Sequence, residues 1–155
     1  MKSVKILLAT MIAAASSLFL IPATASFAGG GGGTVAGPCG TIPSISASAV
    51  TLSGGTTSPL QIRGNVANCS IYLQNYWIDF DEPTNTNTTC KAAFSLFNAL
   101  LLSSGSSQGF STSTNVGGAS ASGCAGVHTV RAVLRSRIDG RVLHTTYVNY
   151  SVVQK

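Results

Sequence analysis

The feature that most constrains this chain is a set of four cysteines behind a segment with the composition of a secretory signal peptide. Residues 1–28 carry two lysines near their start, Lys2 and Lys5, followed by an uncharged apolar run from Ile6 to Ile21. Small residues suited to cleavage follow near Ala25 and Ala28. We therefore predict export, to the periplasm or the cell exterior. An even number of thiols in an oxidising compartment predicts two disulfides. The cysteines are Cys39, Cys69, Cys90 and Cys124.

The remaining length suits one domain. About 127 residues follow the predicted signal, a common size for a domain that buries its own core. The run Gly29–Gly33 opens a stretch over residues 29–38 that we interpret as a flexible spacer, and residues 39–155 form the predicted domain. No later apolar run approaches the ~20 residues of a membrane-spanning helix. After the predicted signal, seven basic and four acidic residues give a net charge of +3, which is too small to predict nucleic-acid binding.

Short runs rich in Val, Ile, Leu and Thr, separated by Gly, Ser, Asn and Pro, predict an all-β domain. We expect strands over 44–52, 59–67 and 71–80, and a short edge strand near 110–114. The third run shows little alternation, so we expect it to be covered on both faces, with Trp77 as the large core residue. Residues 91–102 fit either a strand or one short helix.

The last 28 residues predict a β-hairpin whose register follows from face chemistry. A three-residue loop ending at a left-handed Gly140 separates apolar from polar positions, whereas a two-residue loop mixes them. The predicted partners are Val130 with Val148, Ala132 with Thr146, and His128 with Tyr150. The inward positions are then Val130, Ala132, Leu134, Val142, Val148, Tyr150 and Val152.

About seven strands that end in a long hairpin are typical of a two-sheet antiparallel β-sandwich. The sequences His128–Leu134, Asp139-Gly140 and Tyr147–Val153 are similar to the last two strands of bacterial immunoglobulin-like and fibronectin-type-III-like extracellular domains. The resemblance covers about a fifth of the chain after the signal, and neither strand carries the cysteine of an antibody-type bridge. It implies an immunoglobulin-like sandwich that serves as a spacer, adhesion module or binding module.

Four cysteines allow three pairings, and the sandwich topology favours one of them. Cys39 precedes the first strand and Cys69 ends the second, so an antiparallel pair brings both to one end of the domain. Cys90 follows the Trp77 strand and Cys124 precedes the hairpin, which puts both at the opposite end. We therefore predict Cys39–Cys69 and Cys90–Cys124. The cysteine spacing does not match a zinc site.

The predicted outer face of the hairpin is the main candidate for a binding site. It carries Arg131, Arg135, Arg137, Arg141 and Tyr147, a combination suited to carboxylate, sulfate or phosphate groups. An anionic glycan or a protein surface is the expected partner. The alternative is that the charges only keep exposed strands soluble and discourage edge pairing.

Three of the four acids, Asp79, Asp81 and Glu82, form a cluster that calcium could bind, although its spacing matches no defined calcium loop. A solvated loop is the alternative, and no cofactor is expected. The run Gly105–Gly109 matches the G-x-S-x-G pattern of hydrolases, but a Ser/Gly-rich loop explains it better. His128 and His144 are expected partly buried and ~20 Å apart.

These observations predict a non-enzymatic secreted module that binds a ligand through the hairpin face. A structural envelope protein without a ligand is the second hypothesis. A small secreted hydrolase is the third, and it would require the acids and a histidine to meet in one cleft.

Overall fold

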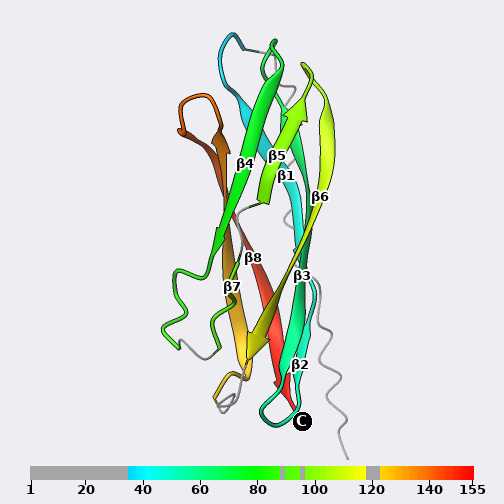
Figure 1. Cartoon of the computed structure of the whole chain (residues 1–155), viewed down its shortest axis with the longest axis vertical. Coiled ribbons are helices and arrows are strands. Elements are labelled where there is room, and N and C mark those ends of the chain that lie inside the picture. The colour runs from blue at the N-terminus through cyan, green and yellow to red at the C-terminus, as the bar shows by residue number, and fades with distance from the viewer. Residues whose placement is uncertain (1–34, 88–89, 95–96, 118–122) are drawn as a thin grey trace, which may run out of the picture.

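The alternating segments form two β-sheets packed face to face (Figure 1). The computed structural model describes residues 35–87, 90–94, 97–117 and 123–155. One sheet has the order β1-β3-β6 and the other the order β2-β8-β7-β4-β5. This is an all-β, immunoglobulin-like sandwich, with eight strands where about seven were expected. They are β1 Gly40–Ala47, β2 Val50–Leu52, β3 Thr57–Asn68, β4 Gln74–Asp81, β5 Phe97–Leu102, β6 Ser107–Gly117, β7 Gly126–Ser136 and β8 Val142–Gln154.

The first expected strand is divided between the two sheets. β1 pairs antiparallel with β3, whereas β2 pairs parallel with the end of β8. Between them, the Ser48 amide donates to the Gln61 carbonyl at 2.9 Å and the Ser48 hydroxyl accepts from the Gln61 amide at 3.0 Å. The chain thus crosses from one sheet to the other within a few residues. The prediction of a single strand over 44–52 missed this crossing.

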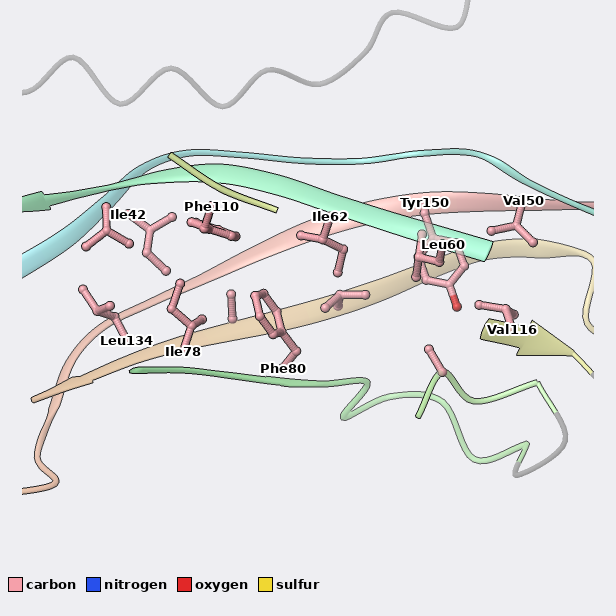
Figure 2. Close-up of a cluster of buried hydrophobic side chains, with 14 of the residues drawn as sticks. Ile42, Val50, Leu60, Ile62, Ile78, Phe80, Phe110, Val116, Leu134 and Tyr150 are labelled. Atoms are coloured by element: carbon pink, nitrogen blue, oxygen red, sulfur yellow. The ribbon is translucent and has the colours of Figure 1, made fainter. Parts of the chain in front are cut away.

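The core lies between the sheets, and its largest fully buried side chain is Tyr76 rather than Trp77. Burial in β4 alternates strictly, so the even positions face the core and Trp77 lies partly buried on the outer face. The prediction that this strand is covered on both faces is therefore wrong. Figure 2 shows side chains of both sheets meeting in this core, among them Ile42, Val50, Leu60, Ile62, Ile78, Phe80, Phe110, Val116, Leu134 and Tyr150.

Residues 97–102 form strand β5, and the described residues of the 91–102 segment contain no helix. The strand expected near 110–114 is longer than predicted. As β6 it pairs with β3 over eleven residues without a shift in register.

The hairpin of β7 and β8 has the predicted register. Val130 pairs with Val148, Ala132 with Thr146 and His128 with Tyr150, and Gly140 has a φ of 72°. Val142 is the exception among the predicted inward residues. The register shifts between Leu134 and Arg135, so Val142 lies opposite the outward-facing Arg135 and is half-exposed.

The structure contains both predicted disulfides, Cys39–Cys69 and Cys90–Cys124. The predicted signal peptide and residues 29–34 of the predicted spacer lie outside the described residues. Val35, near the end of that spacer, forms a bridge with Ser70, so the folded part begins earlier than expected. In the ranges the structure describes, no helix is long and apolar enough to span a membrane.

Candidate functional site

The outer face of the five-stranded sheet carries the most chemically diverse side chains of the described surface. Strand pairing places Trp77 on β4 opposite Arg135 on β7. Further along, Arg131 on β7 has Asp81 on one side and Tyr147 on the other. These side chains form two rows across the sheet, one with Trp77 and one with Tyr147. We call this surface the mixed-charge face; it also includes Asp79.

Each arginine in the two rows is paired with an aspartate of β4. Arg131 donates through Nε to Asp81 Oδ1 at 2.8 Å and through Nη2 to Asp81 Oδ2, a two-point ion pair. This hydrogen bond and the charge of Asp81 raise the pKa of Arg131. Arg135 donates through Nε to Asp79 Oδ2 at 2.7 Å.

Trp77 joins the same network. Its Nε1–H donates to Asp79 Oδ2 at 3.3 Å, so this carboxylate serves both the indole and Arg135. The contact fixes the edge of the indole, and the residue is partly buried on this face. Tyr147, at the other end, is 56% exposed.

The remaining two predicted arginines belong to the β7–β8 turn rather than to the rows. Arg141 donates to the Pro38 carbonyl at 2.7 Å and lies 3.5 Å from Asp139, while Arg137 is exposed at the start of the turn. The five predicted residues therefore divide into a group of three on the sheet and a group of two at its end.

The surface is mixed in charge rather than strongly cationic, which corrects the expectation of a basic hairpin face. Four arginines face three aspartates, and three of the arginines are ion-paired. Sequence reasoning grouped Asp79 and Asp81 with Glu82 as an acidic cluster, although Asp79 fell within the strand predicted over 71–80. Their alternation with buried positions in a strand was the signal that could have placed them opposite the arginines.

The acidic cluster does not form a calcium site. Asp79 and Asp81 point outward to their arginines, whereas Glu82 is fully buried. Strand alternation thus separates carboxylates that are adjacent in sequence. Among the described residues, no three His, Cys, Asp or Glu side chains are grouped so that they could hold a metal ion.

Glu82 instead belongs to a buried polar network at the end of the sandwich with the Cys90–Cys124 bridge. Its Oε1 accepts from the Tyr150 hydroxyl, and its Oε2 accepts from the Ala92 amide at 2.9 Å and from Asn85 Nδ2 at 3.0 Å. Burial and the Glu82 carboxylate raise the pKa of Tyr150. Three donors satisfy the carboxylate, as a buried charge requires.

The two histidines have separate structural partners. His128 stacks on Tyr150 with ring centroids 5.2 Å apart, and its Nε2 lies 2.8 Å from the Cys124 carbonyl. His144 Nδ1 accepts from the Ile42 amide at 3.3 Å, and burial lowers the pKa of His144. This bond gives the Ile42 amide a partner at the bulge between Thr41 and Ser44, where the regular pairing of β1 with β3 is interrupted.

The hydrolase pattern finds no supporting geometry in the described part of the chain. Gly105–Gly109 spans the β5–β6 turn and the start of a strand, with no helix after it. Two shallow depressions of about 260 and 300 Å³ lie on the β1–β3 surface, and neither is lined by His, Asp or Glu.

No family model and no curated protein matches this chain. A solved structure of similar fold is a β-glucuronidase of Bacteroides uniformis, with 16% identity, a TM-score of 0.52, and coverage of 72% of this chain and 14% of that one. A Bacteroides fragilis chain assigned as a β-galactosidase has 12% identity, a TM-score of 0.56, and coverage of 73% and 17%. The CARDB domain of a Pyrococcus furiosus protein has 9% identity, a TM-score of 0.44, and coverage of 77% and 98%. At identities this low, the two Bacteroides structures show a shared fold alone.

Proposed function

We propose that this protein is an exported, non-enzymatic binding module that recognises a polyhydroxylated surface polymer, a glycan, through the mixed-charge face. The observation that carries the proposal is the pair of arginine–aspartate contacts set between Trp77 and Tyr147 on one face of the five-stranded sheet. The two disulfides fit an oxidising compartment.

The chemistry of the face suits hydroxyl groups. Every hydroxyl both donates and accepts a hydrogen bond, and an Arg–Asp pair offers donors and acceptors side by side. Trp and Tyr combine a large apolar ring with a polar edge, so they can cover the apolar faces of sugar rings without losing hydrogen bonds. The row of Tyr147 lies four residues along the strands from the row of Trp77, about 14 Å, and the two residues are two strands apart, about 10 Å, so their Cα atoms are about 17 Å apart. The ligand that contacts both is therefore a chain of several sugars.

A strongly anionic ligand fits the same face less well. Two of the five N–H donors of Arg131 already bind Asp81, and this carboxylate offsets the charge of the guanidinium, so an incoming carboxylate or sulfate meets a pair with little net charge. The nearby aspartates also repel it. Binding that depends on hydroxyl groups and ring stacking should change little when the salt concentration rises, whereas binding of an anion to a cationic stripe would weaken because salt screens the charges.

The absence of catalysis is part of the proposal. A glycoside hydrolase needs two carboxylates on either side of a substrate. Asp79 and Asp81 are engaged by arginines on the surface, and Glu82 is inside the core. A structural envelope protein without a ligand is the competing function, and the binding experiment below distinguishes it.

Retention in affinity electrophoresis or on immobilised polysaccharide tests the proposal. The probes are a neutral β-glucan, a neutral mannan and heparin, each at 50 and 500 mM salt. We expect retention on a neutral polymer at both salt concentrations, and a loss of about tenfold for Trp77→Ala and for Tyr147→Ala, with unchanged retention for Tyr72→Ala, an exposed tyrosine elsewhere. Retention on heparin alone, abolished by salt, would restore the anionic-ligand hypothesis. No retention on any polymer would favour the structural protein.

A further inference from the structure

One end of the sandwich gathers most of the exposed apolar side chains. Figure 1 shows the β3–β4 loop, the β5–β6 turn and the β7–β8 turn at the end opposite the C-terminus. Six of the ten exposed large hydrophobic residues in the described ranges belong to segments at this end. We call them the apical patch: Val35, Ile71, Tyr72, Leu73, Leu101 and Ile138.

Backbone contacts hold these segments beside one another. The Val35 amide donates to the Cys69 carbonyl at 3.0 Å, and the Ile71 amide donates to the Val35 carbonyl at 3.1 Å. Leu101 on β5 lies opposite Asn75 on β4, and the Asn75 carbonyl accepts from the Arg137 amide at 2.9 Å. The patch thus continues from the N-terminal segment across the sheet end to the β7–β8 turn.

The loop that exposes Ile71, Tyr72 and Leu73 is fixed by a buried asparagine. Asn68 is 3% exposed, and its Nδ2 donates to the Tyr72 and Leu102 carbonyls, both at 2.9 Å. Its Oδ1 accepts from the Tyr76 hydroxyl at 2.9 Å, and burial raises the pKa of Tyr76 to about 12. The adjacent Cys39–Cys69 bridge adds a covalent constraint.

Three consecutive large apolar residues are therefore held in solvent by an ordered framework. They are 44%, 58% and 58% exposed, respectively. Exposed apolar groups of this size on a soluble domain mark an interaction surface, and a preformed loop loses little entropy on binding.

The charges next to the patch lie on the β7–β8 turn. Residues 69–75 and 97–108 contain no Asp, Glu, Lys or Arg. The neighbouring turn carries Arg137 and Arg141, with Asp139 as its single acid, 3.5 Å from Arg141. The turn therefore places two positive charges and one negative charge, a net +1, beside the apolar side chains, with Arg137 outside the Arg141–Asp139 pair. A positive charge next to apolar side chains is complementary to a surface that is anionic outside and apolar beneath.

We propose that the apical patch inserts into the interfacial region of an anionic lipid bilayer. Apolar side chains at the tip of a rigid loop can enter the acyl boundary, tyrosine suits the headgroup level, and arginine can contact lipid phosphates. The mixed-charge face lies along the side of the sheet, so it stays accessible when the end of the domain is at the membrane. This inference does not depend on the proposed glycan binding.

Vesicle co-sedimentation tests the insertion, with phosphatidylcholine vesicles and with vesicles containing 30% phosphatidylglycerol as probes. We expect binding to the anionic vesicles. The Tyr72→Ser/Leu73→Ser double variant should bind at least about tenfold more weakly. Arg137→Gln should lose about fivefold on anionic vesicles only.

Val127→Ser/Val153→Ser is the matched control, because both valines are at least half-exposed and lie at the ends of β7 and β8 opposite the β7–β8 turn. The control should bind vesicles like the unmodified chain. Every variant carries the same N-terminal segment, so differences in vesicle binding between variants come from the substitutions. Since all substituted side chains are exposed, thermal melting should be unchanged, and the patch variants should keep their retention on polysaccharide. No binding to vesicles, equal loss in the control, or capture of a protein partner by the patch without vesicle binding would overturn the inference.

Discussion

The buried contact between Tyr150 and Glu82 gives a stability prediction of defined size. Tyr150→Phe removes the hydroxyl that donates to Glu82 Oε1 but keeps the ring that stacks on His128. The carboxylate is fully buried, so water cannot replace the lost donor. Hydrogen bonds to charged groups contribute about 1.5–3 kcal/mol, and we expect the free energy of unfolding to fall by that amount.

Urea unfolding with both disulfides intact measures this change, followed by circular dichroism at constant pH. The midpoint should shift to lower urea with an unchanged slope, because the surface exposed on unfolding is nearly the same. Tyr147→Phe is the control: it removes the same atom from a tyrosine that is 56% exposed, and should change stability by less than about 0.5 kcal/mol.

A double-mutant cycle isolates the role of the charge. In a Glu82→Gln background, the amide oxygen can accept from Asn85 and Ala92, and the amide nitrogen can donate to the Tyr150 oxygen. Removing the hydroxyl should then cost about 1 kcal/mol, because no buried charge loses its donor. An equal cost of Tyr150→Phe in both backgrounds, or a cost no larger than that of Tyr147→Phe, would refute this reasoning.

Three further predictions concern the frame of the sandwich. The lowered pKa of His144 means that its contribution to stability is complete above the unfolded value of about 6.5 and is lost as pH falls through the folded pKa, so His144→Gln should reduce the loss of stability between pH 7.5 and 5. Gly64→Ala should destabilise by about 1–3 kcal/mol or more in urea unfolding, because its Cβ would lie 2.5 Å from a backbone oxygen of β1. Gly109→Ala should cost less, because its Cβ would meet a side-chain tip at 3.3 Å and a backbone oxygen at 3.8 Å, an ordinary contact distance. Replacing Cys90 and Cys124 together by Ala should lower the unfolding free energy by about 4 kcal/mol, since the bridge spans 34 residues; unchanged midpoints would contradict each expectation.

Sequence reasoning succeeded where periodicity and turn chemistry act locally. The hairpin register followed from Gly140 and from the separation of apolar and polar faces, and the cysteine pairing followed from antiparallel topology. Val142 was misplaced because a bulge inserts an extra residue in one strand, so the residues beyond it exchange faces relative to the partner strand. No single residue in the sequence marks the position of this bulge.

The errors concern long-range partners. Trp77 was expected in the core because of its size, but its neighbour Tyr76 occupies the core, where its hydroxyl reaches the Cys39 carbonyl at 2.6 Å. The charge balance of the hairpin face depended on Asp79 and Asp81 of a strand some fifty residues earlier. Composition can list the charges, but only strand order shows which of them neutralise each other.

The positions of the two disulfides also determine how far this domain can lengthen under tension. A force applied between Cys39 and Lys155 passes through each bridge and bypasses the 30 and 34 residue steps that the bridges enclose. From Cys39 to Lys155 the chain has 116 residue-to-residue steps, and taking away the 30 and 34 that the bridges enclose leaves 52 outside them. Fully extended, these 52 steps span about 180 Å, whereas all 116 steps of the reduced chain span about 400 Å. The oxidised domain thus has a short mechanical reach, and the strand β2, enclosed by the first bridge, is not in the covalent path of the load.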